Sequence, residues 1–240
     1  MNTFENLKLK KQLKNAIADL GIEKLTPIQQ ESYSSILGGS DFVGIAQTGT
    51  GKTFAYLLPI LQELKFSDQQ HPRVLILAPT RELVIQIVKE IEKLTPYLSI
   101  RVAGVYGGSS NIKTQKIAVN DGLDIVVGTP RRLYDLVLAN VLRLKAVKKL
   151  VIDEVDIMLD FGYKTQLKNI FDHLPENLWG YACCSKDCKI EVCSSTYVIS
   201  CVWRYYWDKS RHGENILLIL TSYNHYVQNI LDTPKLPSFP

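Results

Sequence analysis

An apolar segment that runs into a glycine-rich turn ending in Lys-Thr constrains this chain more than any other feature. The stretch reads Gly44-Ile45-Ala46-Gln47-Thr48-Gly49-Thr50-Gly51-Lys52-Thr53. Glycines let the backbone curl so that successive N–H groups point at one place, where side chains would block the approach. A helix over residues 53–64 would add the positive end of its dipole. The pattern predicts a cradle for nucleotide phosphates, with Lys52 on the β/γ-phosphates and the Thr53 hydroxyl on Mg²⁺.

A surface loop rich in Gly and Thr is the alternative interpretation of this turn. The complete Gly-x-Gly-Lys-Thr core and the apolar segment before it favour the phosphate cradle. One departure is visible, since Ala46 stands where the general pattern has its first glycine.

The composition is that of a globular protein that can bury a sizeable core. Of the 240 residues 46% are apolar and 22% charged, enough for one large α/β domain. The net charge of +4 permits a nucleic-acid partner without requiring one. No apolar run approaches 18 residues, and the N-terminus lacks the layout of a signal peptide, so we expect no membrane span and a cytoplasmic location.

Short apolar runs rich in β-branched residues alternate with amphipathic helical patterns up to about residue 175. Such runs suit strands that are buried on both faces of a parallel sheet. We expect strands at 42–46, 74–78, 100–105, 124–127 and 150–152, and helices at 9–20, 81–94, 131–138 and 166–171. The alternation predicts a doubly wound α/β fold, in which ligands bind at the carboxyl ends of the strands.

The segment Val151-Ile152-Asp153-Glu154-Val155-Asp156 provides the second half of a nucleotide site. A strand ending in Asp can hold Mg²⁺, and the adjacent Glu can orient or deprotonate the attacking water. Alone, an Asp-Glu pair after a strand is more often a solvated loop. About a hundred residues after the phosphate cradle, it predicts a nucleotide-hydrolysing site.

Together these two motifs resemble the first RecA-like domain of a DEAD-box ATP-dependent RNA helicase, most like the bacterial RhlE type. Residues 46–53 match the family's phosphate loop, and Asp153-Glu154-Val155-Asp156 matches its namesake motif with Val in place of Ala. The resemblance implies a RecA-like P-loop domain with a mostly parallel sheet and helices on both faces. It implies that Lys52, Thr53 and Asp153 hold Mg²⁺ and ATP, that Glu154 activates water, and that Asp156 couples the site to a later motif.

Leu25-Thr26-Pro27-Ile28-Gln29 resembles the family's adenine-reading motif, with Phe4 upstream as its aromatic partner. A Gln side chain is both donor and acceptor and can pair with adenine in a bidentate way, which predicts selectivity for ATP over GTP. For Phe4 the alternative is an anchor that packs on the first helix. The expected nucleotide-binding residues are therefore Phe4, Thr26, Gln29, Ala46, Gln47, Thr48, Gly49, Thr50, Gly51, Lys52 and Thr53.

Three further segments resemble the family's RNA-backbone motifs, and each follows an expected strand. At such positions backbone N–H groups, Thr hydroxyls and Arg can bind phosphates without reading base sequence. Arg131 stands where the family has Gly; without the family, Thr80 and Thr129 would be helix N-caps and Arg81 a solvated charge. The expected RNA-binding residues are Pro79, Thr80, Arg81, Gly107, Gly108, Thr129, Pro130 and Arg132.

After Glu176 the sequence departs from the family pattern. The family's Ser-Ala-Thr motif is expected near residue 184, where the chain reads Cys183-Cys184-Ser185-Lys186, and all five cysteines fall in this region. Their spacing does not complete a zinc site. We therefore predict a helicase domain, residues 1–176, and an atypical C-terminal tail, residues 177–240. Our hypothesis is that the tail comes from a reading-frame change or a disrupted gene. We also expect the sheet to lose the strand that the family places between the phosphate-loop strand and the Asp-Glu strand, with residues 189–202 an imperfect substitute.

These observations favour the nucleotide- and RNA-binding half of an ATP-dependent RNA helicase, acting as a monomer with RNA as its partner. The alternative is a catalytically inactive ATP/RNA-binding fragment that lacks the second helicase domain and its arginine fingers. A P-loop ATPase with a non-RNA substrate is a third possibility, against which the segments around Arg81 and Arg132 argue.

Overall fold

The computed structural model describes residues 3–39, 42–46, 49–108, 112–175, 179–184 and 217–219, the last two segments by their backbone alone. Within these residues the strands form a seven-stranded sheet of order β3-β4-β2-β5-β6-β1-β7, in which every pair is parallel. The strands are β1 Phe42–Ile45, β2 Val74–Leu77, β3 Val102–Val105, β4 Ile125–Gly128, β5 Lys149–Ile152, β6 Trp179–Cys184 and β7 Leu217–Ile219. The predicted α/β fold is confirmed.

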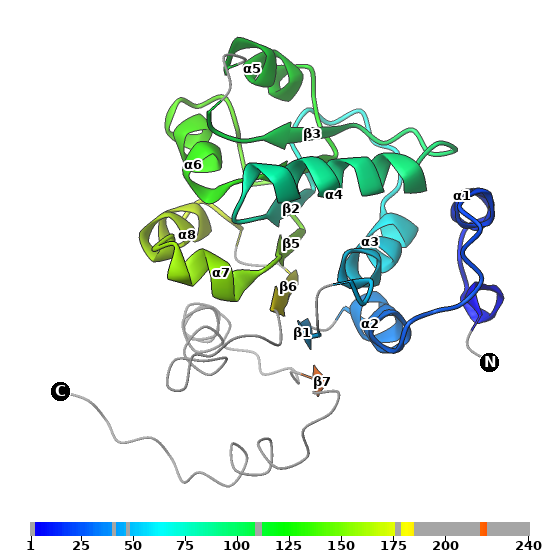
Figure 1. Cartoon of the computed structure of the whole chain (residues 1–240). Coiled ribbons are helices and arrows are strands. Elements are labelled where there is room, and N and C mark those ends of the chain that lie inside the picture. Colours follow the sequence, from blue (N-terminus) through cyan, green and yellow to red (C-terminus); the bar gives the residue numbers. More distant parts are fainter. Residues whose placement is uncertain are drawn as a thin grey trace, which may run out of the picture.

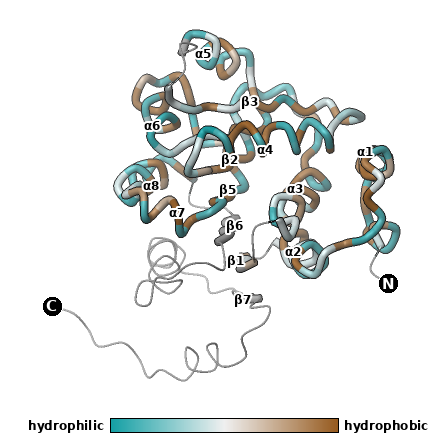
Figure 2. Tube along the Cα trace, viewed as in Figure 1, coloured by the Kyte–Doolittle hydropathy of each residue, from teal (hydrophilic) through white to brown (hydrophobic). Residues whose placement is uncertain are grey.

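Helices cover both faces of the sheet (Figure 1). They are the 3-10 helix η1 Phe4–Asn6 and α1 Lys11–Asp19, α2 Pro27–Leu37, α3 Lys52–Glu63, α4 Arg81–Leu94, α5 Ile112–Asn120, α6 Pro130–Leu138, α7 Val155–Asp160 and α8 Lys164–Phe171. One hydrophobic cluster joins α1 to α4 to one face, and a second joins α5 to α8 to the other. Along α4 hydrophobic and hydrophilic positions alternate with the helical period (Figure 2), so that Val84, Ile87 and Ile91 are buried.

Consecutive residues of the central strands belong to opposite clusters. Val74 and Ile76 face the cluster of α1 to α4, and Leu75 and Leu77 face that of α5 to α8. All four are buried. Because both faces are covered, the strand reads as an unbroken apolar run, and for that reason β2 falls within the predicted residues 74–78.

The strand β6 corrects one expectation. It lies between β5 and β1 and pairs with both, with Ala182 opposite Ile152 and Cys184 opposite Ile45. The expectation that the tail would leave this central position without a strand is therefore wrong. Parallel pairing uses main-chain groups, and the segment contains Trp and Tyr, which favour strands, and no Pro. The substitute proposed at residues 189–202 and the cysteines at 188, 193 and 201 lie outside the described residues.

At the amino ends of the strands a buried carboxylate joins three of them. Asp124, just before β4, accepts hydrogen bonds from Arg73 Nη2 (2.8 Å) and from the backbone N–H and Nε of Arg101 (3.0 and 3.2 Å). Burial by itself raises the pKa of Asp124, but the hydrogen bonds from Arg101 and Arg73 outweigh it and leave the pKa lowered. This ion cluster lies at the edge of the sheet opposite the phosphate loop.

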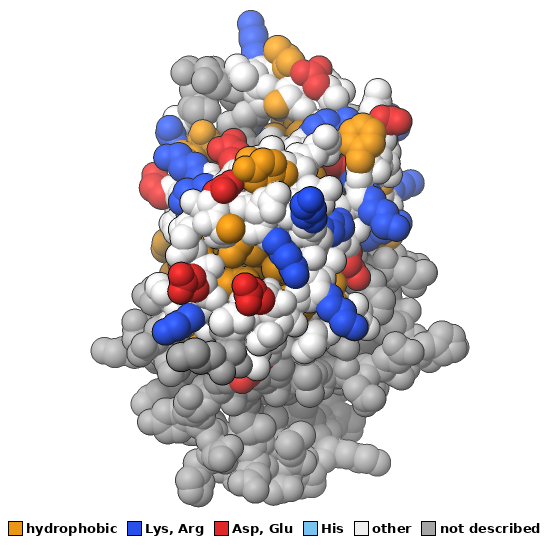
Figure 3. Space-filling model, turned by 90° about the vertical axis from the view of Figure 1, so that its right-hand side faces the viewer, with side chains coloured by type: hydrophobic (Ala, Val, Ile, Leu, Met, Phe, Trp, Pro, Cys, Tyr) orange, Lys and Arg blue, Asp and Glu red, His pale blue; other side chains and the backbone are white. Residues whose placement is uncertain are grey.

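In the part of the chain that the structure describes, no helix is both long and apolar enough to span a membrane. The side of the molecule on which α1 lies carries Lys and Arg interspersed with Asp and Glu (Figure 3). A surface that carries both positive and negative charges does not favour binding of a polyanion, so we do not expect the RNA-binding face on this side.

Candidate functional site

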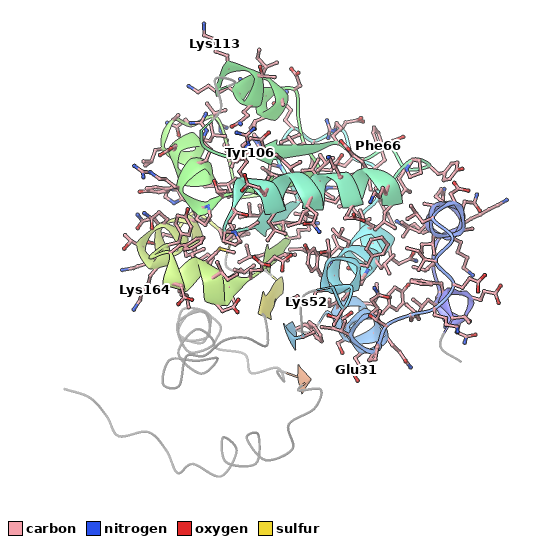
Figure 4. All side chains as sticks on the ribbon, in the orientation of Figure 1. Glu31, Lys52, Phe66, Tyr106, Lys113 and Lys164 are labelled. Atoms are coloured by element: carbon pink, nitrogen blue, oxygen red, sulfur yellow. The ribbon has the colours of Figure 1, made fainter. Side chains whose placement is uncertain are left out.

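The glycine-rich turn connects β1 to α3 as the sequence predicts. Gly49 and Gly51 have φ of 80° and 85°, a conformation that residues with a Cβ rarely adopt. Lys52, the first residue of α3, is buried, and its Nζ donates a hydrogen bond of 2.9 Å to the carbonyl of Ala46 (Figure 4). The lysine therefore folds back across the turn that it follows. Gln47 and Thr48 lie outside the described residues.

Ala46 stands in place of a glycine without strain. Its φ is not positive, and its side chain is buried in a small cluster with Ile28 of α2 and Ala55 of α3. A methyl group thus adds packing at a position where the backbone does not require glycine. Thr50 and Thr53, the other predicted phosphate-loop residues, are half-buried, with Thr53 in the first turn of α3.

Gln29 binds the phosphate loop directly. Its Nε2 donates to the carbonyl of Gly51 (3.2 Å), and its Oε1 accepts from the backbone N–H of Thr26 (3.0 Å). A Cβ on Gly51 would lie 2.3 Å from Gln29 Nε2, so the contact also requires glycine at that position. The predicted adenine reader is thus joined to the phosphate cradle, a contact between residues 22 apart that sequence reasoning missed.

Phe4 packs into the core, as expected if it anchors the N-terminal segment. Its side chain in η1 is buried and belongs to the hydrophobic cluster of α1 to α4. The N-terminal segment that carries it is held against α3 at a second point, because Lys10 Nζ donates to the last-turn carbonyls of Leu61 and Leu64. Phe4 therefore anchors this segment, and its stacking on adenine stays a prediction.

Asp153 and Glu154 follow β5 at the same edge of the sheet as the phosphate loop. Asp153 is buried, and its Oδ2 accepts a hydrogen bond of 2.9 Å from the hydroxyl of Tyr56 in α3. Burial raises the pKa of Asp153, against the hydrogen bond from Tyr56 and the positive charge of Lys52. Burial and then the charge of Asp153 raise the pKa of the half-buried Glu154, and Lys52 lowers it. Lys52 thus acts electrostatically on both carboxylates.

Glu154 has a left-handed backbone, with φ 52° and ψ 49°, and is the N-cap residue of α7. A non-glycine residue in this region costs of order 1 kcal/mol, and such strain often marks functional sites. The turn ends β5 sharply and starts a helix, which buries Asp156 in its first turn. The three acidic residues of the motif thus have three different environments.

The donor set fits a magnesium ion better than a metal held by protein alone. Within the described residues no group of three or more His, Cys, Asp or Glu could enclose a metal. Mg²⁺ is commonly held by one or two carboxylates together with substrate phosphates and waters. The Thr53 hydroxyl and the Asp153 carboxylate, beside a phosphate cradle, are ligands of that kind.

The predicted RNA-binding segments lie around a cavity of about 440 Å³. Tyr106, which Figure 4 labels, is one of the residues that line it. The segments follow β2, β3 and β4, which are neighbours in the sheet, so their ends lie side by side. The cavity is lined by Pro79, Arg81, Tyr106, Gly107, Gly108, Thr129, Arg131, Arg132, Asp135 and Tyr163. Two predicted residues do not line it. Thr80 caps α4 by accepting from the N–H of Leu83 (3.2 Å), and Pro130 is buried at the start of α6.

Two arginines of the cavity are held in place by their neighbours. The guanidinium of Arg81 lies 5.0 Å from the centre of the Tyr106 ring, a cation–π contact. Arg132 Nε donates to Gln115 Oε1 (3.3 Å), and Gln115 Nε2 donates to the carbonyl of Tyr106 (3.1 Å). Arg132 Nη2 is buried and has no hydrogen-bond partner among the described residues. These arginines are placed to receive an anion.

Sequence reasoning missed Tyr106, Gln115 and Tyr163 around the cavity and Tyr56 beside Asp153. Tyr106 directly precedes Gly107, so its place after β3 could have indicated it. Tyr56 lies four residues after Lys52, so the helical period could have indicated that the two side chains share a face. Gln115 in α5 and Tyr163 before α8 have no such spacing to a predicted site residue.

Comparisons with known proteins show the family to which this chain is similar. The family model described as DEAD/DEAH box helicase matches residues 26–200, a stretch that includes β6. The chain is 39% identical over 176 residues to the ATP-dependent RNA helicase DeaD of Haemophilus influenzae, covering 73% of this chain and 28% of that protein. It is 41% identical over 175 residues to DeaD of Escherichia coli, covering 72% and 28%.

A solved structure shares the fold. The crystal structure of a DEAD box protein from Methanococcus jannaschii superposes with a TM-score of 0.75 at 30% identity, covering 85% of this chain and 54% of that one. The chain thus spans little more than a quarter of the two DeaD proteins, and the division at residue 176 stays a prediction. Because the family model covers most of the chain and the motif residues stand in their expected places, this protein belongs to the DEAD/DEAH box helicase family.

Proposed function

We propose that this chain is the ATP-binding and RNA-backbone-binding half of an ATP-dependent RNA helicase. One observation carries the proposal: the phosphate-loop helix and the Asp-Glu motif meet at one edge of the sheet, where Tyr56 of α3 donates a hydrogen bond of 2.9 Å to Asp153. Along the same edge lies the arginine-lined cavity. A nucleotide site and a polyanion site on neighbouring strand ends are what coupling of ATP to RNA requires.

Each residue has a defined part in nucleotide binding. The backbone around Gly49 and Gly51 surrounds the phosphates, and Lys52 exchanges the carbonyl of Ala46 for a phosphate oxygen. Thr53 and Asp153 would hold Mg²⁺, which neutralises charge on the β- and γ-phosphates when bound. Glu154 orients the attacking water and accepts its proton, and the burial that raises its pKa brings it closer to the range of an effective base. Asp156 couples the nucleotide site to a later motif of the family.

RNA binds in the cavity through its phosphates. Arg81 and Arg132 supply the charge, and Thr129 together with the Gly107-Gly108 turn supplies close backbone approach. Arg131 also lines the cavity, so the residue that replaces the family's Gly adds a positive charge there. Contacts of this kind predict binding that does not depend on base sequence and that weakens with salt.

The test measures ATP hydrolysis with and without RNA, beside a Lys52→Ala control. RNA-stimulated turnover that the substitution abolishes supports the helicase assignment. Equal background in both proteins, with ATP still bound by the unsubstituted chain, supports the alternative of a catalytically inactive ATP/RNA-binding fragment. Absence of ATP binding refutes both.

The RNA face is tested separately with Arg132→Ala. A plot of the logarithm of the RNA-binding constant against the logarithm of the salt concentration falls with salt. Removing one phosphate contact makes this fall less steep, by about one unit of slope, and weakens binding equally for unrelated sequences. The matched control is Arg143→Ala, because Arg143 is exposed and does not line the cavity. An unchanged salt slope in Arg132→Ala would exclude this residue from the interface.

A further inference from the structure

Tyr56 links the phosphate-loop helix to the carboxylate of the Asp-Glu motif. It lies one helical turn after Lys52, so both side chains leave α3 on the same face. Its hydroxyl donates to Asp153 Oδ2 at 2.9 Å, across 97 residues of sequence. In the sheet β6 separates β1 from β5, so the two motif-bearing strands do not pair directly. The hydrogen bond from the Tyr56 hydroxyl therefore connects the two motifs directly, although their strands are not neighbours.

The surroundings of this hydrogen bond make it rigid. Tyr56 is 1% exposed and belongs to the same hydrophobic cluster as Phe42 and Val151, and Asp153 is 3% exposed. A tyrosine has few rotatable bonds, and this ring is enclosed by the core, so its hydroxyl is a fixed donor. The backbone N–H of Asp153 is held as well, by the carbonyl of Leu77 at 2.9 Å. The main chain of Asp153 is therefore fixed by the sheet, and its carboxylate is oriented by the hydrogen bond from Tyr56.

We propose that Tyr56 is a positioning residue for Asp153, orienting its carboxylate toward the magnesium ion of a bound Mg²⁺–ATP. An ionised carboxylate has about four acceptor sites, so the hydrogen bonds from Tyr56 and from the backbone N–H of Glu154 orient it and leave capacity for a metal or its waters. The inference rests on the proposed nucleotide site. It adds a residue that acts through Asp153 without touching the nucleotide itself.

The simpler interpretation is that the tyrosine hydroxyl only satisfies a buried carboxylate. The two interpretations differ in what magnesium does. A positioning role predicts that loss of the hydroxyl weakens ATP binding only when Mg²⁺ is present. A purely structural role predicts either no change in ATP affinity or an equal change with and without the ion.

The experiment titrates ATP into the full chain by calorimetry, with chelator and with excess Mg²⁺. The magnesium ratio is defined as Kd in chelator divided by Kd in Mg²⁺. Tyr56→Phe keeps the buried ring and removes only the hydroxyl, and we expect it to lower the magnesium ratio about tenfold, the effect of one hydrogen bond to a charged group. In a chain that already carries Asp153→Asn, Tyr56→Phe should lower the ratio no further, since the effect passes through Asp153.

The matched control is Tyr33→Phe. Tyr33 is also a buried tyrosine, but its hydroxyl donates to the carbonyl of Lys8 (3.1 Å), not to a residue of the site. It should leave the magnesium ratio unchanged. Melting is followed for every variant, and titrations are made at a temperature at which all are folded.

Three outcomes overturn the inference. They are a Tyr56→Phe ratio equal to that of the unsubstituted chain, an equal loss of affinity in chelator and in Mg²⁺, and an effect that persists in full beside Asp153→Asn. If the unsubstituted chain itself has a ratio of one, the proposed Mg²⁺–ATP site fails and takes the inference with it. That result is distinguished from a failure of Tyr56 alone by the first titration.

Discussion

The hydroxyl of Ser32 in α2 donates a hydrogen bond of 2.8 Å to the carbonyl of Ala55 in α3. Four residues after Ala55 stands Pro59, inside the helix, which has no N–H to satisfy that carbonyl. Ser32 is fully buried and supplies the missing donor from the neighbouring helix. The proline that interrupts the phosphate-loop helix is thus compensated by the helix that carries Gln29.

Ser32→Ala should lower the free energy of unfolding by about 1–3 kcal/mol, because a buried carbonyl loses its partner. In a chain that already carries Pro59→Ala the loss should be smaller, since that substitution restores a backbone N–H that can donate to the carbonyl of Ala55. Urea denaturation of the four proteins of this cycle measures the coupling. Additive effects would show that Ser32 does not compensate for Pro59.

Gly51→Ala should destabilise the protein more than Gly49→Ala. Both glycines have a positive φ, so both substitutions carry a strain of about 1–2 kcal/mol. A Cβ at Gly49 meets nothing within 4 Å, whereas at Gly51 it displaces the Gln29 side chain. The substitution Gln29→Ala should therefore lower the stability of the Gly51→Ala protein less than it lowers the stability of the unsubstituted chain. Thermal melting of the five proteins decides; equal costs at the two glycines would refute the prediction.

Asp124→Asn should lower the free energy of unfolding at neutral pH by about 3 kcal/mol, because two arginines lose their buried carboxylate. The pKa of Asp124 is lowered in the folded protein, so its stabilisation is present above the ordinary value of 3.8 and is lost as pH falls through the folded pKa. The difference between the two proteins should therefore shrink below about pH 4.

Urea unfolding at neutral and at acid pH measures that difference. Asp121→Asn is the control, since Asp121 is exposed in the turn before Asp124. A difference that stays constant down to pH values below about 3 would show that the Asp124 carboxylate is not the titrating group.

Thr80→Ala should cost about 1 kcal/mol, the usual value for loss of an N-cap, while Thr80→Ser should cost little because serine retains the oxygen that accepts from Leu83. Chemical denaturation gives both values. If the serine variant is as unstable as the alanine variant, the methyl group of Thr80, and not its hydroxyl, stabilises α4.

The strands β1 to β5 and the helix α4 were predictable because segments that are buried on both faces, or along one face, show this in the pattern of their apolar residues. The runs at 74–78 and 81–94 coincide with β2 and α4 within a residue. The helix α2 was not predicted, since its face toward α3 buries Gln29 and Ser32 and its apolar residues do not follow a clean helical period. In a sequence, polar residues that are buried to make a hydrogen bond cannot be distinguished from polar residues on the surface.

The motifs indicated which strand ends carry candidate site residues, but not how those residues are connected. Lys52, Asp153 and the arginines of the cavity were indicated by motif and strand end. The bonds from Gln29 to Gly51 and from Tyr56 to Asp153 depend on helix packing, which local patterns do not encode. The prediction that the sheet loses the strand at β6 was wrong. The segment lacks the family's motif, and we inferred from this that it could not form a strand, although main-chain pairing tolerates many sequences.

The position of β6 between β1 and β5 also sets an order of assembly. A chain that grows from its N-terminus makes the phosphate loop early and the Asp-Glu motif about a hundred residues later. Until residues 179–184 have emerged and inserted, β1 is not joined to β5, because the two strands are connected only through β6. The segment at residues 179–184 therefore joins the two motif-bearing strands into one sheet, and β7, which follows it in the chain, pairs with the other side of β1.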